Sequence, residues 1–236
     1  MVSRQIGVDA FGSLDCAGQA IDYGAGMANE EMLTDIGAGM LAEAFPLEHR
    51  PAASKAAKIV ARGLADRQWT ERFSVCAMGQ TVSIPARLHF MSGKLPVSEG
   101  DDAWPFVRAL QTRSNDGYER QRAARDLLTD LQQWGAPFIV ALLGEYIVEI
   151  LDDVSEALTP EVEQILAAFI IDNQTFWATT KRRVTSYWNA YYRSRYASEL
   201  RRAYRRDEYV GFHLTNRQEA AAFGASMAPC GPRPCR

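Results

Sequence analysis

The sequence lacks any hydrophobic run long enough to cross a membrane, and it has few cysteines. Its longest uncharged apolar run, residues 136–144, has nine residues and stops at Glu145, whereas a membrane-spanning helix needs about 20. The first residues also lack the apolar core of a secretory signal. Four cysteines in 236 residues exclude a disulfide framework. We therefore expect a cytoplasmic protein with reduced thiols.

Signatures of metal, cofactor and catalytic sites are missing as well. Cys230 and Cys235 lie close together, but no second pair completes a zinc site. The sequence contains no phosphate-binding loop, dinucleotide-binding glycine pattern, zinc-protease helix motif or nucleophile elbow. It also contains no RRM, KH, zinc-finger or homeodomain signature. We expect no metal and no cofactor, and the sequence alone names neither a reaction nor a partner.

Glycine is unevenly distributed along the chain. Seven of the 17 glycines lie between residues 7 and 39, and glycine in a helix interior costs about 1 kcal/mol relative to alanine. We therefore expect residues 1–50 to form a flexible or irregular arm. With 47% hydrophobic residues in the whole chain, the remainder has enough apolar side chain for a core. We expect a helical domain over residues 51–215 and a flexible tail containing proline and cysteine over residues 216–236.

Residues 72–91 have the two-residue period of strands. Apolar residues alternate with polar ones on both sides of a turn at Met78 and Gly79, which predicts a β-hairpin. Pro85 has no N–H group, so we expect the second strand to lie at an edge or to bend there.

The chain from residue 102 to about residue 208 is expected to be helical. The segment 103–110 (AWPFVRAL) recurs as residues 135–142 (GAPFIVAL) after 32 residues, and both copies place a proline in the first helical turn. The polar turn at Asp116 and Gly117 opens a second helix between the two copies. This unit, with its proline and with an aspartate ahead of an arginine and a small residue, resembles a HEAT-type helical repeat over about residues 103–172. The resemblance implies stacked antiparallel helical hairpins and carries no catalytic residues.

A long C-terminal helix is expected after these hairpins. Thr159 is an N-cap candidate with Pro160 behind it, and apolar residues then recur about every 3.5 positions as far as Tyr191. This spacing predicts a helix of 30 residues or more. The expected fold class is therefore mainly α: stacked antiparallel HEAT-like hairpins, a long C-terminal helix and the small β-hairpin.

Charge is the most unusual feature of the sequence. Residues 145–163 contain seven acids and no base, whereas residues 181–206 contain nine bases and one acid. Tyrosine and tryptophan alternate with these bases. The candidate residues for binding a partner or a polyanion are Lys181, Arg182, Arg183, Tyr187, Trp188, Tyr191, Arg193, Arg195, Arg201, Arg202 and Arg205.

Four explanations of the basic segment are open. The acidic segment could neutralise it within one folded body, leaving the tyrosines in the core, or another protein could dock on it. Nucleic acid is the alternative partner, because arginines bind phosphates and aromatic rings stack on bases. Adsorption to a membrane surface also fits an amphipathic aromatic and basic helix.

Glu145 and Glu149 are the only carboxylate pair that suggests an active site. On one buried helix face, two carboxylates could raise the pKa of one of them and support acid–base chemistry. The structural explanation is pairing with Arg113, Arg120 or Arg122 of the preceding unit. We expect a non-enzymatic scaffold or adaptor that binds another protein or a second copy of itself. A nucleic-acid-binding protein is the alternative, and an enzyme using the carboxylate pair is a third.

Overall fold

A computed structural model describes the chain. It covers residues 13–14 and 20–21 and residues 37–66, 68, 70–91, 93, 95–193 and 203–224. The short elements are β1 (Ser13–Leu14), β2 (Ala20–Ile21), α1 (Ala38–Ala42), η1 (Leu47–His49), β3 (Arg72–Ala77), β4 (Gln80–Pro85), η2 (Gln133–Gly135) and η3 (Trp188–Tyr192). The longer helices are α2 (Arg50–Gly63), α3 (Trp104–Gln111), α4 (Gly117–Thr129), α5 (Ala136–Leu143), α6 (Val148–Glu156), α7 (Pro160–Asp172), α8 (Gln174–Tyr187) and α9 (Val210–Phe223).

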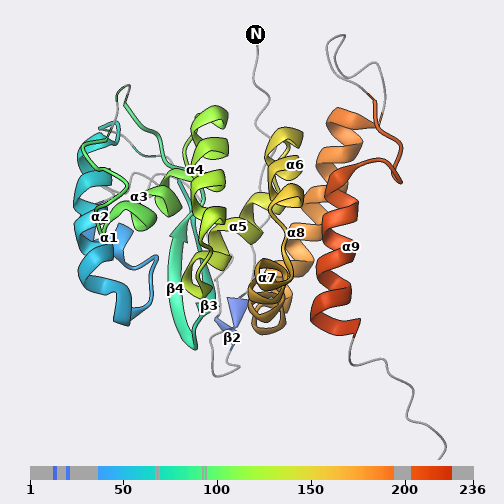
Figure 1. Ribbon diagram of the computed structural model, residues 1–236, viewed down its shortest axis with the longest axis horizontal. Helices are drawn as coiled ribbons and strands as arrows, with labels where there is room; N and C mark the ends of the chain where they lie inside the picture. Colours follow the sequence, from blue (N-terminus) through green and yellow to red (C-terminus); the bar gives the residue numbers. More distant parts are fainter. Residues whose placement is uncertain are drawn as a thin grey trace, which may run out of the picture.

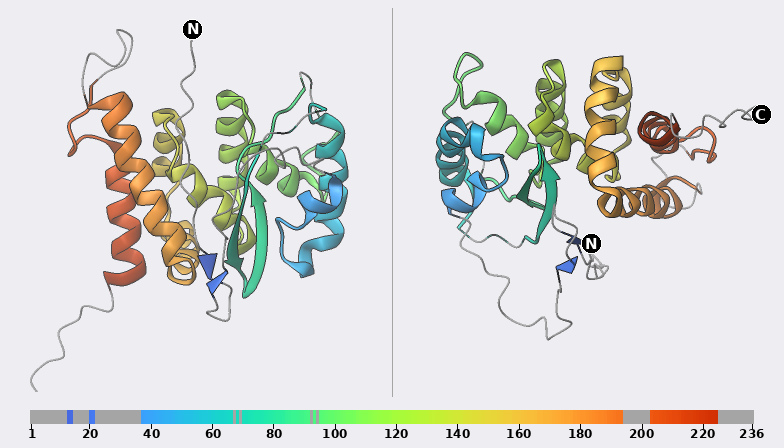
Figure 2. Two further views of the ribbon diagram at one scale, coloured as in Figure 1. Left: turned by 180° about the vertical axis from the view of Figure 1, so that it is seen from behind. Right: turned by 90° about the horizontal axis from the view of Figure 1, so that it is seen from below.

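Helices α1 and α2 lie at one edge with α3 beside them, the β3–β4 hairpin and helices α4 to α7 lie in the middle, and α8 and α9 form the opposite edge (Figure 1). The view from behind gives the same order (Figure 2). The fold is mainly helical, as expected. Among the described helices, none is both long and apolar enough to span a membrane.

The folded part begins earlier and ends later than the sequence predicted. Leu41 and Phe45 are fully buried, and the Phe45 ring stacks on Phe138 with its centroid 5.3 Å away. Residues 37–50 therefore form α1 and η1 and pack on the core through Leu41 and Phe45, rather than forming an irregular arm. Helix α9 runs to Phe223, past the expected start of the tail at residue 216. The tail cysteines Cys230 and Cys235 lie outside the described residues.

The β-hairpin is confirmed. Strands β3 and β4 are antiparallel, with Val75 opposite Val82. The turn residues Met78 and Gly79 both have positive φ, 53° and 72°, as the tight hairpin turns with right-handed twist require. Strand β4 ends at Pro85, which agrees with the missing N–H group of proline.

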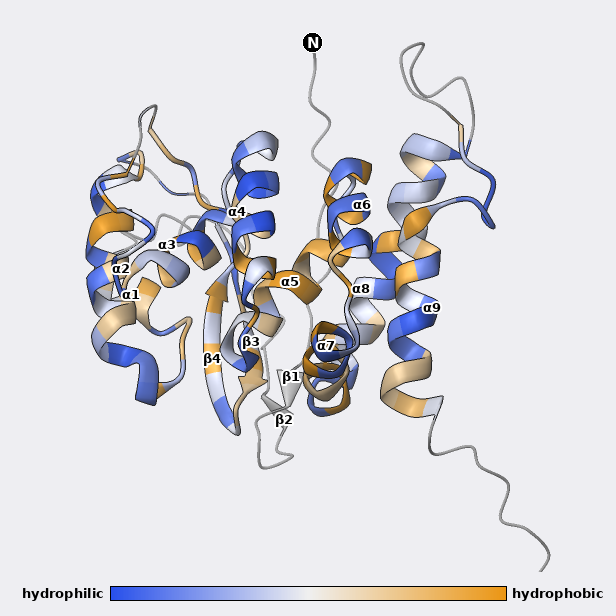
Figure 3. Cartoon of the chain, viewed as in Figure 1, coloured by the Kyte–Doolittle hydropathy of each residue, from blue (hydrophilic) through white to orange (hydrophobic). Residues whose placement is uncertain are grey.

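The helices after the hairpin pack in neighbouring pairs. Helix α3 packs on α4, α4 on α6, and α6 on α9, while α5 packs on α7. Both α3 and α5 have a proline in the first turn, as predicted. The Asp116 side chain caps α4 by accepting hydrogen bonds from the N–H groups of Tyr118 and Glu119 at 2.8 and 3.3 Å. Helix α5 is apolar along its length and fully buried (Figure 3).

The expected single helix of 30 residues is wrong, because Asn173 divides it into α7 and α8. The cap at Thr159 is confirmed, since its hydroxyl accepts a hydrogen bond from the Val162 N–H group. Asn173, however, has φ −130° and ψ 49°, which is not helical. Its side chain accepts a hydrogen bond from the Cys76 N–H group and donates one to the Cys76 carbonyl oxygen, each 2.8 Å long. It therefore pairs with the edge of β3 in place of a neighbouring strand.

Replacing Asn173 by alanine tests the hydrogen bonds of its side chain. The change leaves buried backbone groups of Cys76 and Phe169 without their hydrogen-bond partner. We expect the free energy of unfolding to fall by about 2–4 kcal/mol, measured by urea titration. Gln174→Ala, at the exposed neighbouring position, is the control and should change it by less than about 0.5 kcal/mol. Equal effects of the two changes would contradict the role assigned to Asn173.

Candidate functional site

A buried carboxylate surrounded by arginines lies between the hairpin and the helices. Glu145 follows α5 and is 4% exposed. Its Oε1 atom lies 2.8 Å from Nη2 of Arg87 and 3.7 Å from Nη2 of Arg113, and its Oε2 atom lies 3.7 Å from Nη2 of Arg120. We call these four residues the arginine cluster. Pairing with Arg113 and Arg120 was predicted from the sequence, whereas Arg87 was missed.

The same arginines also bind backbone carbonyl groups. Arg87 and Arg120 both donate to the carbonyl oxygen of Ser114, at 3.2 and 2.7 Å. Arg113 donates to the carbonyl oxygen of Ala86 at 2.6 Å. The arginine cluster therefore joins the end of β4, the turn between α3 and α4, and the loop after α5.

Burial and charge set the protonation of this cluster. Burial lowers the pKa of Arg113 to about 9, Glu145 acts against this change, and the charges of Arg87 and Arg120 add to it. Burial by itself raises the pKa of Glu145, but the three guanidinium groups outweigh it and hold that pKa below its ordinary value of 4.5. Glu145 is therefore a carboxylate at neutral pH, paired with cations.

A fourth arginine lies beside the cluster. Arg183 of α8 crosses over Gly144, where an added Cβ atom would lie 3.3 Å from the Arg183 Cδ atom. The charge of Arg183 also contributes to the lowered pKa of Arg113. Three guanidinium groups thus surround the Glu145 carboxylate, and the Arg183 side chain lies beside them at Gly144. Among the described residues, no carboxylate pairs with Arg183.

Three tyrosines form a group of ring contacts that includes Tyr146, the residue after Glu145. The ring centroids of Tyr146, Tyr187 and Tyr191 lie 5.5–6.1 Å apart. Tyr146 and Tyr191 are 36% and 41% exposed. Arg183, Tyr187 and Tyr191 follow one another at intervals of four residues and so share one side of α8 and η3. We call the three tyrosines, together with Arg87 and Arg183, the tyrosine surface.

The other predicted binding residues are divided between the surface and the interior. Lys181 pairs with Glu219 of α9, and Arg205 pairs with Asp207. Arg193 donates to the Asn189 side chain and lies over the Trp188 ring. The Trp188 indole donates to the Tyr204 carbonyl oxygen at 3.0 Å and packs edge-on against Phe212. Arg195, Arg201 and Arg202 lie outside the described residues.

The acidic segment does not neutralise the basic helix in the part of the chain that the structure describes. Asp153 pairs with Arg125 of α4 at 2.8 Å, and Glu163 pairs with Arg217 of α9 at 2.6 Å. These two acids thus pair with bases of other helices, and on α8 Lys181 pairs with Glu219 of α9.

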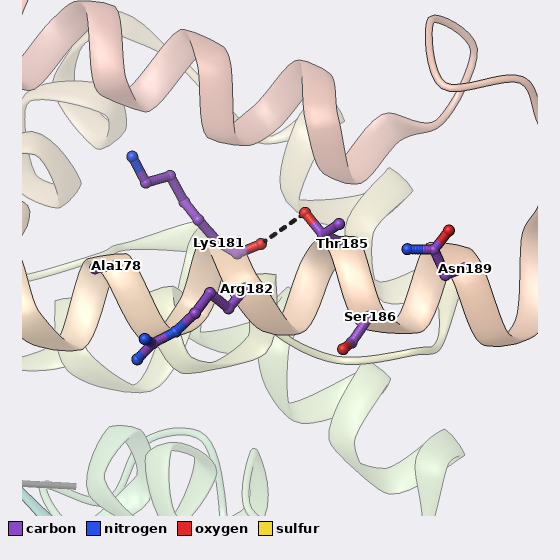
Figure 4. Close-up of a pocket in the computed structure, with 6 residues that line it drawn as sticks. All are labelled: Ala178, Lys181, Arg182, Thr185, Ser186 and Asn189. Atoms are coloured by element: carbon purple, nitrogen blue, oxygen red, sulfur yellow. Dashed lines mark hydrogen bonds between the residues drawn. The ribbon is translucent and has the colours of Figure 1, made fainter.

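An open hollow of about 540 Å³ lies along α8. It is lined by Ala178, Lys181, Arg182, Thr185, Ser186 and Asn189. Lys181 and Thr185 lie on the side of α8 that faces α9, and Arg182 points away from α9 (Figure 4). The Arg182 side chain donates to the Thr179 hydroxyl at 3.0 Å. The hollow brings Lys181 and Arg182 together on a side of α8 different from that of Tyr187.

Glu145 and Glu149, the third hypothesis from the sequence, do not lie together as a carboxylate pair. Gly144 ends α5 and α6 begins only at Val148, so Glu145 and Glu149 do not share a helix face. Glu145 is buried among arginines and Glu149 is exposed. Within the described ranges, no group of His, Cys, Asp and Glu side chains is suited to hold a metal ion.

Comparisons with protein-family models, curated proteins and solved structures find no match to this chain. The candidate site therefore stands on the geometry above.

Replacing Glu145 by glutamine tests the arginine cluster. The change preserves shape but leaves the buried guanidinium groups of Arg113 and Arg120 without a counter-charge. We expect the free energy of unfolding at pH 7 to fall by about 3–5 kcal/mol, measured by urea titration. Glu149→Gln is the matched control, because Glu149 is exposed, and it should change stability by less than about 0.5 kcal/mol.

The pH dependence gives a second readout of the same variant. Because the folded-state pKa of Glu145 is below 4.5, its contribution is fully present above that pH and is lost as the pH falls through the folded-state pKa. The stability difference between wild type and Glu145→Gln should therefore shrink as the pH falls below 4.5. A difference that stays constant down to pH 2, or one that is absent at pH 7, would contradict the assigned ion pairs.

Proposed function

We propose that the protein is a non-enzymatic helical scaffold or adaptor that binds another protein through the tyrosine surface. Its helical hairpins stack in a HEAT-like manner in this proposal. The packing of α4 on α6 and of α6 on α9 supports the stacked arrangement (Figure 1), since repeat units of this kind bury apolar faces against their neighbours. A cytoplasmic location is part of the same proposal.

The tyrosine surface carries the proposal. Tyrosine and arginine are enriched among the residues that contribute most to binding energy at protein interfaces. Tyr146 and Tyr191 expose more than a third of their surface, although each has a ring neighbour within 6 Å. Tyr187 and Arg183 continue this surface along α8. A rigid aromatic group beside an unmatched cation is suited to a partner that presents acidic and apolar groups.

The arginine cluster argues against catalysis at Glu145. A general acid needs a pKa near the working pH, whereas the guanidinium groups lower the pKa of Glu145 below its ordinary value. Its Oε1 atom is already within 2.8 Å of Arg87. The surroundings of this carboxylate thus favour structure and binding over proton transfer.

Nucleic acid is the second candidate partner. The observation that favours it is the excess of arginines over carboxylates, with three guanidinium groups around Glu145 and Arg183 beside Gly144, because phosphates would balance the excess charge. The aromatic residues favour a protein instead. The side chains of Trp188, Tyr192 and Tyr204 are packed within the fold, which leaves fewer rings on which bases could stack.

Photo-crosslinking from the tyrosine surface tests the proposed docking site. We expect the full chain with p-benzoylphenylalanine at position 191 to give, on irradiation in cells, one predominant crosslinked protein or a crosslinked dimer of the chain itself. The same amino acid at position 47 is the control, because Leu47 is 65% exposed at the opposite edge of the fold. An identical set of products at equal yield from both positions would contradict the proposal.

Absorbance and salt distinguish the nucleic-acid alternative. If a protein is the partner, the full chain purified at low salt should show the 260/280 nm absorbance ratio of protein alone. A ratio typical of nucleic acid that returns to the protein value after washing in about 1 M salt, where surface charges are screened, would favour the second candidate. The variant Arg183→Gln should then retain less nucleic acid than Arg182→Gln.

A further inference from the structure

The arginine cluster holds more positive charge than the described residues neutralise. Arg113 and Arg120 are 3% and 2% exposed. The Nη1 atom of Arg113 and the Nε atom of Arg120 are buried, yet neither makes a hydrogen bond with a described residue. A buried guanidinium group without a full set of partners is costly, and two of them meet at one carboxylate here.

From this placement we infer that the arginine cluster and Arg183 together form a binding site for a phosphate group, supplied by inorganic phosphate or by a small phosphomonoester. The guanidinium group is planar and presents paired donors that match the oxygen atoms of phosphate. A dianionic group balances two positive charges, which lowers the net charge of the four arginines and Glu145 from three positive charges to one.

The route into the site is the tyrosine surface. The Arg87 side chain is 29% exposed, and Arg183 is half-buried. Their charges act on the Tyr187 hydroxyl group: burial and Glu145 raise the pKa of Tyr187, and Arg183 and Arg87 act against that rise. In this inference a phosphate group reaches Arg87 and Arg183 before Arg113 and Arg120, because the first two side chains are more exposed.

The two buried arginines of the cluster then add to the attraction for the phosphate group. Arg113 and Arg120 lie in the interior, where charges interact more strongly than in water. Their remaining N–H groups are held in place because each arginine also donates to a backbone carbonyl oxygen. The site is therefore organised before a ligand arrives, which lowers the entropy cost of binding.

This inference deepens the proposed function, because Arg183 and Tyr187 belong to both the phosphate site and the tyrosine surface. The two ideas remain separable by experiment. Phosphate binding needs only the purified chain, whereas docking needs the partner. If the chain does not bind phosphate but still crosslinks from position 191, only the phosphate site is contradicted. If the chain binds phosphate but gives no specific crosslink from position 191, only the docking proposal is contradicted.

Thermal unfolding and calorimetry of the full chain test the phosphate site. At an inorganic phosphate concentration ten times Kd, the Tm should rise by about 3–6 °C, and sodium chloride at equal ionic strength should give no such rise. Phenyl phosphate in a parallel titration identifies the source. Tighter binding than inorganic phosphate indicates an organic phosphomonoester beside the tyrosines, and equal binding indicates recognition of the phosphate group alone.

Two neighbouring arginines provide the matched variants. Arg183→Gln should weaken phosphate binding at least about tenfold, whereas Arg182→Gln, with the same loss of charge one residue away, should weaken it less than about twofold. In the wild-type chain, the NMR resonances of the Arg87 and Arg183 Nε–H groups should shift on titration and that of Arg182 should not. This readout holds even if a variant fails to fold. Equal weakening by both variants, or no phosphate-specific rise in Tm, overturns the inference.

Discussion

The buried carboxylate of Glu145 is the interaction on which the arrangement of the molecule depends. It pairs with arginines from the end of β4 and from the region of the α3–α4 turn, segments that are far apart in the sequence. A buried carboxylate and a buried guanidinium group are each costly alone, so each requires the other. Because the same arginines also bind backbone carbonyl groups of these loops, one charge fixes the position of the hairpin against the helices.

A second polar contact, between Asn173 and Cys76, sets the direction of the C-terminal helices. Asn173 ends α7 and binds the edge of β3 through Cys76, so α8 begins in a new orientation. That orientation brings Arg183 over Gly144 and places the tyrosines of α8 and η3 beside Tyr146. The tyrosine surface is therefore a consequence of two polar contacts made elsewhere in the fold. Asp153 of α6 and Glu163 of α7 do not neutralise it, because they pair with Arg125 of α4 and Arg217 of α9.

Local signals in the sequence predicted local structure well. The hairpin turn, the prolines that open α3 and α5, the turn at Asp116 before α4 and the cap at Thr159 depend on neighbouring residues, so their patterns sufficed. The break at Asn173 could not be predicted, because an apolar spacing of 3.5 residues continues through it and the cause lies 97 residues away in β3. Arg87 was missed for the same reason. The core residues of α1 were missed because the high glycine content of residues 1–50 indicated an irregular segment throughout.

The central claim is that the arginines around Glu145 carry positive charge available to an incoming anion. Crystals of the full chain grown with selenate, a tetrahedral oxyanion with anomalous scattering, test it most directly. We expect an anomalous peak within hydrogen-bond distance of the Arg183 guanidinium group and of at least one arginine of the cluster. Selenate bound elsewhere on the molecule, with no anomalous peak beside Arg183 and Arg87, would contradict the proposed anion site.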